Sequence, residues 1–151
     1  MRFFLIDKIV RWEVGVGAEA LKNVSLSEDF FDDHFPRHPV MPGVLIIEGM
    51  AQLAGLLLEA SREARHGGNA KALLSILEKT KFRRMVRPGD TLTYKVEIAS
   101  FNEASGKAAA RALRDGELVT STDMVFVFQE HDDPGLEARK RALMEIWLGK
   151  R

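Results

Sequence analysis

The plainest pattern in the chain is a strict alternation of apolar and polar residues over positions 91–98. Such alternation predicts a β-strand with one face against the core and the other in solvent. Runs rich in β-branched, aromatic and aliphatic residues predict further strands at Phe3–Val14, Glu19–Leu26, Lys71–Val86 and Leu118–Phe128. Gly15 and Gly17 separate the first two runs, which predicts a hairpin, and residues 87–90 (RPGD) form a turn.

Residues 107–114 (KAAARALR) give conflicting local signals, because their alanine content favours a helix. The dipeptide Asp115-Gly116 follows at once and is typical of a two-residue hairpin turn into the next strand. We therefore predict a strand in which Ala108, Ala110 and Ala112 face inward. Small side chains there suit a sheet that packs closely on a helix.

Residues 41–58 are apolar or small at every position except Glu48 and Gln52. A helix that is apolar all round belongs in a core, and a carboxylate within it needs a partner, since burying an unpaired charge costs several kcal/mol. The polar residues from Ser61 to Asn69 predict the end of this helix and a loop. A second helix is predicted at Pro134–Leu148, with a rough apolar stripe of Leu136, Leu143, Ile146 and Trp147.

Three prolines, at positions 36, 39 and 42, keep the segment before the core helix extended or turned. The helix then begins near Gly43, whose N–H has no intrahelical partner and whose lack of a side chain leaves room for a ligand. Glu48 and Gln52 are four residues apart, so the amide can orient the carboxyl group. With His34 just upstream, the segment supplies a base near neutral pH, an acid and N–H donors for a developing oxyanion.

Composition limits the alternatives. The chain has 151 residues, 46% of them hydrophobic, and its 22 basic residues balance its 22 acidic ones, so no overall field attracts nucleic acid or a membrane. Cysteine is absent, which removes disulfides and thiol chemistry. The N-terminal apolar run is too short for a signal sequence, and Glu48 argues against a membrane span. We expect one domain at residues 1–130, a helical extension at 131–151, and a soluble cytoplasmic protein.

The stretch His34–Glu48 (HFPRHPVMPGVLIIE), followed by Met50-Ala51-Gln52, resembles the signature of the β-hydroxyacyl-[acyl-carrier-protein] dehydratases of type II fatty acid synthesis. The similarity continues in order at residues 4–9 (FLIDKI), 22–25 (KNVS) and 81–90 (KFRRMVRPGD), and ends near His131. The resemblance implies a hotdog fold of class α+β, in which a curved antiparallel sheet wraps one long apolar helix.

The resemblance also implies a reaction, the loss of water from a (3R)-hydroxyacyl thioester to give the trans-2-enoyl thioester without metal or redox cofactor. His34 would take the α-proton, and Glu48, held by Gln52, would protonate the leaving hydroxyl. The N–H groups of Gly43 and Val44 would hold the thioester oxygen. The acyl chain would lie in an apolar tunnel along the interface of a dimer, with candidate lining from Phe35, Val40, Met41, Met50 and Leu53.

Partners follow from the same resemblance. The substrate would arrive on acyl carrier protein, and the histidine and carboxylate of one site would come from different subunits of a homodimer, which often forms a trimer of dimers. The basic residues Lys81, Arg83 and Arg84, with Lys79 and Arg87 beside them, would steer the acidic carrier; the alternative is a solvated strand face. A metal site at His34 and His38 is not predicted, because Pro36 prevents the helix that would align them.

Arg37 stands where the family commonly has glycine, and arginine is costly there if the position needs a positive φ. Two rival functions from other classes stay open. One is a hotdog thioesterase that uses Glu48. The other is a non-catalytic subunit that binds acyl carrier protein, with Arg37 blocking turnover.

Overall fold

A computed structural model of the chain describes residues 4–150. Its sheet contains β1 (Lys8–Glu13), β2 (Gly17–Asn23), β3 (Ala70–Phe82), β4 (Thr91–Phe101), β5 (Ser105–Arg114) and β6 (Glu117–Glu130). A short 3-10 helix, η1 (Asp29–Asp32), precedes the core helix α1 (Gly43–His66), and α2 (Pro134–Trp147) closes the chain. The strands lie in the order β1-β2-β4-β5-β6-β3, all antiparallel, so β1 and β3 are the two edges.

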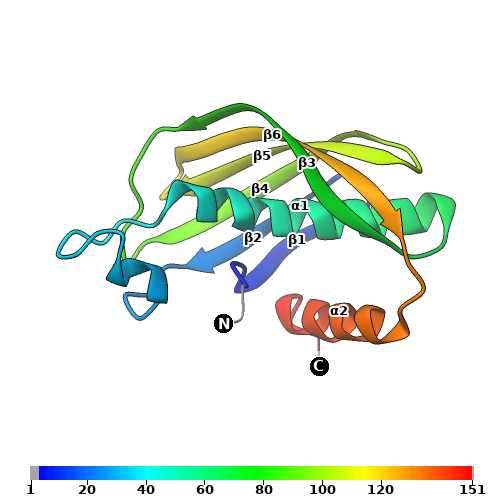
Figure 1. The fold of residues 1–151 in the computed structure, drawn as a ribbon, viewed down its shortest axis with the longest axis horizontal. Coiled ribbons are helices and arrows are strands. Elements are labelled where there is room, and N and C mark those ends of the chain that lie inside the picture. The colour runs from blue at the N-terminus through cyan, green and yellow to red at the C-terminus, as the bar shows by residue number, and fades with distance from the viewer. Residues whose placement is uncertain (1–3, 151) are drawn as a thin grey trace.

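The sheet curves around α1, and α2 lies apart from the sheet beside the N-terminal segment (Figure 1). This is the expected hotdog arrangement. The alternation at 91–98 is that of a strand with one buried face, as predicted, because Leu92, Tyr94 and Val96 are fully buried in the core. The alanine-rich segment is strand β5, and its inward alanines have at most 1% of their surface exposed.

Close approach between the sheet and α1 requires small residues on the helix as well. A Cβ placed on Gly49 would lie 2.3 Å from the hydroxyl oxygen of Tyr94 in β4, nearer than real atoms approach. Gly49 therefore lets the aromatic ring of Tyr94 pack directly under the turn that carries Glu48. Burial raises the pKa of the Tyr94 hydroxyl well above its ordinary value.

The predicted end of the core helix was wrong, because α1 continues through Ser61 and ends at His66. The polar side chains of its last turns are used inside the fold. Ser61 Oγ donates to the carbonyl of Leu57 at 2.7 Å and accepts from the N–H of Gly15 at 2.8 Å. Arg62 is buried and pairs with Glu130 at 2.8 Å. These hydrogen bonds favour continuation of the helix, which a linear reading of polarity could not reveal.

Three strands are shorter than predicted. The first begins at Lys8 instead of Phe3, which lies outside the described residues, because Leu5 and Ile6 leave the edge and are buried in the core. β3 ends at Phe82 instead of Val86, because the carbonyl of Val86 accepts from the N–H of Met41 at 2.7 Å. β2 likewise ends at Asn23, short of the predicted Leu26. The chain after β3 therefore holds the proline-rich segment in place.

α1 is long and apolar enough to span a membrane by length and composition alone, but 61% of its most apolar window is buried inside the fold. Its surroundings are those of the core helix of a soluble protein. α2 begins as predicted at Pro134, where Asp133 Oδ1 accepts from the N–H of Leu136 at 3.0 Å. Its last residue, Trp147, is buried.

Candidate active site

The loop between η1 and α1 fixes the orientation of the His34 ring. His34 Nδ1 lies 2.7 Å from the carbonyl oxygen of Val40, and the N–H of Val40 donates to the carbonyl of His34 at 2.9 Å. A carbonyl can only accept, so Nδ1 carries the hydrogen and Nε2 is left with a free lone pair. The ring also stacks on Phe35, with centroids 4.1 Å apart. The half-buried imidazole is thus held in the tautomer that a base needs.

Arg37 occupies the tip of this loop in the left-handed region, with φ of 69°. Phe35 and His38 close the turn through reciprocal backbone hydrogen bonds of 3.1 and 3.0 Å. The position therefore takes the conformation for which glycine is best suited, and this is the condition under which arginine is costly there. The turn keeps that conformation, with Arg37 exposed to solvent.

The first turn of α1 presents free donors. Leu45 and Ile46 donate to the carbonyl of Pro42, whereas the N–H groups of Gly43 and Val44 have no acceptor among residues 4–150. A Cβ on Gly43 would lie 2.5 Å from the ring of Phe82, so that ring packs directly on the helix start. Two N–H groups at a helix N-terminus favour a developing negative charge.

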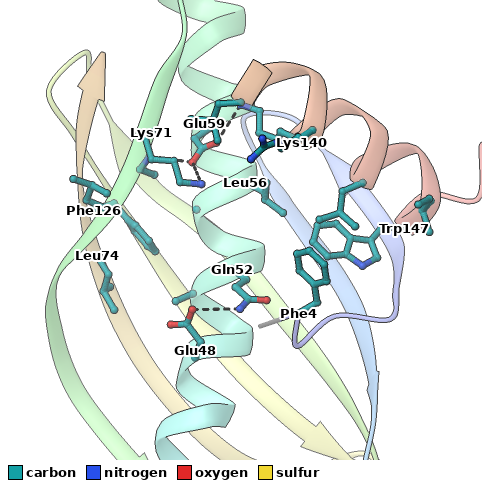
Figure 2. Close-up of a pocket in the computed structure, with 18 residues that line it drawn as sticks. Phe4, Glu48, Gln52, Leu56, Glu59, Lys71, Leu74, Phe126, Lys140 and Trp147 are labelled. Carbon is teal, nitrogen blue, oxygen red and sulfur yellow. Dashed lines mark hydrogen bonds and ion pairs between the residues drawn. The ribbon is translucent and has the colours of Figure 1, made fainter. Parts of the chain in front are cut away.

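Glu48 and Gln52 form the pair expected from their spacing. Gln52 Oε1 accepts from the N–H of Leu5 at 3.0 Å, which turns the amide so that Nε2 donates to Glu48 Oε1 at 3.3 Å. The carboxyl group of Glu48 is half-buried and faces a cavity instead of the close-packed core. One oxygen is held and the group remains accessible from the cavity, as Figure 2 shows.

That cavity has a volume of about 700 Å³ and lies between α1, β3 and α2. Most of its lining is apolar, and its polar groups gather around Glu48 and Gln52 at one end and around Glu59 at the other (Figure 2). The lining includes Phe4, Leu56, Leu73, Leu74, Phe126, Leu143, Ile146 and Trp147.

Several predicted site residues lie elsewhere in the protomer. His34 does not line the cavity that contains Glu48. Met41, Met50 and Leu53 are close-packed in the core, with at most 2% of their surface exposed, whereas Phe35 is 53% exposed. Lys81 and Arg83 are exposed near the end of β3 without an ion-pair partner among the described residues, and Arg84 pairs with Glu117 at 3.0 Å. Val40 contributes through its backbone.

The sequence analysis missed Glu59, the most deeply buried carboxylate that the structure describes. Its Oε2 accepts from the N–H of Ala72 at 3.0 Å and lies 3.5 Å from Lys71 Nζ, and its Oε1 lies 3.1 Å from Lys140 Nζ. Burial lowers the pKa of Lys140, but the carboxylates of Glu59 and Glu137 outweigh that effect and raise the pKa above its ordinary value. The available signal was a lone glutamate between Leu58 and Ala60 in an apolar helix.

Comparison of the sequence with known proteins assigns the chain to a family. Residues 1–123 match the family model of the FabA-like domain. A 3-hydroxyacyl-[acyl-carrier-protein] dehydratase FabZ of Anoxybacillus flavithermus is 42% identical over 128 residues, which cover 85% of this chain and 88% of that protein. A FabZ of the same description from Staphylococcus aureus is 43% identical over 128 residues, covering 85% of this chain and 86% of the relative.

Among solved structures, the dehydratase heterocomplex ApeI:P of Xenorhabdus doucetiae superposes with a TM-score of 0.69 at 15% identity, over 91% of this chain and 89% of that one. At this low identity, the similarity to ApeI:P supports only the fold.

Proposed function

The chain belongs to the FabA-like family, and we propose that it is a 3-hydroxyacyl-[acyl-carrier-protein] dehydratase whose base is His34 and whose acid is Glu48. The observation that carries these roles is the orientation of Glu48 by Gln52 at the end of an apolar cavity. An acid placed there can protonate a hydroxyl while the rest of the acyl chain stays out of water.

The proposed reaction consists of two proton transfers, one from the α-carbon and one to the leaving hydroxyl group. His34 Nε2 removes the α-proton, and the electron pair moves through an enolate whose oxygen is held by the N–H groups of Gly43 and Val44. The bond from the β-carbon to the hydroxyl oxygen then breaks as Glu48 gives that oxygen its proton, and water leaves. Solvent carries the proton from His34 back to Glu48 before the next turnover.

We propose that the functional unit is a homodimer in which His34 of one subunit meets Glu48 of the other. Two features of the protomer support this. His34 is outside the cavity that contains Glu48, and the edge strand β3 exposes Leu73, Leu74 and Ile76 by 41 to 47%. The free N–H and C=O groups of an exposed apolar edge strand can pair with a strand of a second sheet. Assembly of three such dimers into a hexamer is part of the same proposal.

Lys81 and Arg83 are proposed to steer the acidic carrier protein, because they are exposed and without an ion-pair partner in the described part of the chain. They lie close to Phe82, which covers the helix start at Gly43. The substrate is soluble and carrier-bound, which supports a cytoplasmic location. We also propose that residues 1–130 form the catalytic domain and that residues 131–151 are an extension of it, since the family match ends at residue 123.

The test is hydration of crotonyl-CoA, followed by loss of enoyl absorbance, with wild type beside His34→Ala and Glu48→Gln. Both variants should lose at least about 100-fold in kcat, as removal of a general acid or base does. His38→Ala and Glu63→Gln are the matched controls, since neither side chain has a polar contact among residues 4–150, and both should stay near wild type.

Release of free thiol from acyl-CoA, measured in parallel, would indicate the thioesterase instead. A folded wild type that binds acyl carrier protein yet neither hydrates nor hydrolyses any thioester would overturn the enzyme assignment.

A further inference from the structure

α2 is fastened to the rest of the protein at two points. In its middle turn, Lys140 Nζ lies 3.1 Å from Glu59 Oε1 of α1. At its last residue, Trp147 Nε1–H donates to the carbonyl of Ile6 at 2.8 Å, and its ring meets Phe4 edge-on with centroids 5.9 Å apart. Between these anchors, Leu143 and Ile146 line the cavity, Leu143 partly buried against the core and Ile146 largely exposed. α2 therefore stands over an apolar space that continues from the candidate active site.

The far end of that space carries paired charges. Glu59 has only 5% of its surface exposed, and Lys71, Lys140 and the N–H of Ala72 surround its carboxylate (Figure 2). An apolar chain that reached this cluster would have to displace paired charges, which is unfavourable. Glu48 and Glu59 are eleven residues apart on one helix, so about 16 Å of helix separates the catalytic end from the charged end.

We propose that α2 is the outer wall of the acyl-chain site and that the Glu59–Lys140 pair closes its end, so that α2 limits the length of acyl chain the enzyme accepts. The inference rests on the proposed function, since Glu48 at the open end defines where the thioester lies. It concerns a segment beyond the residues that match the family, because α2 begins eleven residues after that match ends. The occupant is the acyl tail of the substrate, which fits a cavity that is apolar between two polar ends.

The kinetic test fills the cavity with a larger side chain on α2. Leu143→Trp places a large ring in the cavity, and Ala138→Trp places the same ring on the exposed side of the helix. We expect Leu143→Trp to lower kcat/KM for trans-2-dodecenoyl-CoA by at least about 10-fold while crotonyl-CoA changes by less than about 2-fold. Ala138→Trp should leave both values unchanged. A uniform loss on both substrates, or no change on either, would contradict the inference while leaving the proposed function in place.

A binding test needs no catalysis. The protein has two tryptophans, so Trp12→Phe leaves Trp147 as the only one, and its ring lines the cavity. In this variant, dodecanoyl-CoA should shift or quench the emission of Trp147, whereas butyryl-CoA and coenzyme A alone should not. Equal responses to all three ligands would overturn the inference. A chain-length-dependent response in a protein without hydratase activity would support the cavity assignment and show that the failure lies in the proposed reaction.

Discussion

At the scale of single residues, the proposed chemistry depends on how two side chains are held. Glu48 and His34 each have one heteroatom fixed by a neighbour, Gln52 for the acid and the Val40 carbonyl for the base. Each keeps another heteroatom available for the substrate. The spacing of the residues predicted the Glu48–Gln52 pair. It could not predict the His34–Val40 contact, which arises because the proline-rich loop folds back on itself.

Gln52→Met should lower kcat by about 10- to 100-fold with little change in KM, because the acid is then misplaced although the cavity keeps its volume. Gln52 positions Glu48 and does not itself react, so the acidic limb of the kcat–pH profile should also move. Hydration of crotonyl-CoA from pH 5 to about 9 measures both effects. A variant with unchanged kcat and a raised KM would show instead that Gln52 contacts the substrate.

Arg37→Gly should stabilise the protein by about 0.5 to 1 kcal/mol. A left-handed conformation costs an L-residue about 1 to 2 kcal/mol, and glycine returns part of that gain through its greater freedom in the unfolded chain. Unfolding in urea measures the difference. Arg37→Ala is the control, since alanine suffers the same backbone strain, and an equal gain in both variants would point to the removed guanidinium rather than to φ.

At the scale of elements, the fit between α1 and the sheet depends on Gly49, which the helix pattern alone does not distinguish from Gly55. Gly49 meets Tyr94, whereas a Cβ on Gly55 would lie 3.5 Å from the ring of Phe126, an ordinary contact. The sequence predicted an apolar helix inside a sheet and small residues on β5. Which helical glycine touches the sheet depends on the rotation of α1, and that rotation is a property of the assembled core.

Gly49→Ala should destabilise the fold by about 1 to 3 kcal/mol, because overpacking a rigid core forces side chains or backbone to move. Gly55→Ala should stabilise it by up to about 1 kcal/mol, since alanine is the better helix former and has room there. Thermal unfolding of both variants gives the comparison. Equal effects would mean that helix propensity, not contact with Tyr94, decides the outcome.

The attachment of α2 should weaken at alkaline pH. The pKa of Lys140 is raised in the folded protein by Glu59 and Glu137, despite the opposing effect of burial and with Lys71 also facing Glu59. A raised pKa means that the stabilising contribution is complete below the ordinary pKa of 10.5 and disappears as the pH rises through the higher folded value. Emission of Trp147 in the Trp12→Phe variant, titrated from about pH 9 to 12, should report this. Adding Lys140→Met should abolish that transition.

At the scale of the whole molecule, the protomer explains why the candidate site was only partly predictable. The signature segment predicted His34 and Glu48 as the catalytic pair, and the fold places them on different surfaces, one on the loop and the other in the cavity. Glu59 and its lysines were missed because Lys71 and Lys140 lie on other elements, and Lys140 is 81 residues away along the chain. Long-range ion pairs of this kind carry no periodic signal in a sequence.

A mixed-subunit experiment tests the proposed dimer most directly. His34→Ala and Glu48→Gln are each expected to be inactive, but a dimer with one subunit of each kind has one site with both changes and one site with neither. Random mixing followed by unfolding and refolding should therefore restore up to about a quarter of wild-type hydration activity. Mixing either variant with a double variant carrying both changes is the control and should restore nothing. If the two single variants also restore nothing while refolded wild type recovers its activity, His34 and Glu48 of one site belong to the same subunit, and closure of the loop onto the cavity within one protomer would have to bring them together.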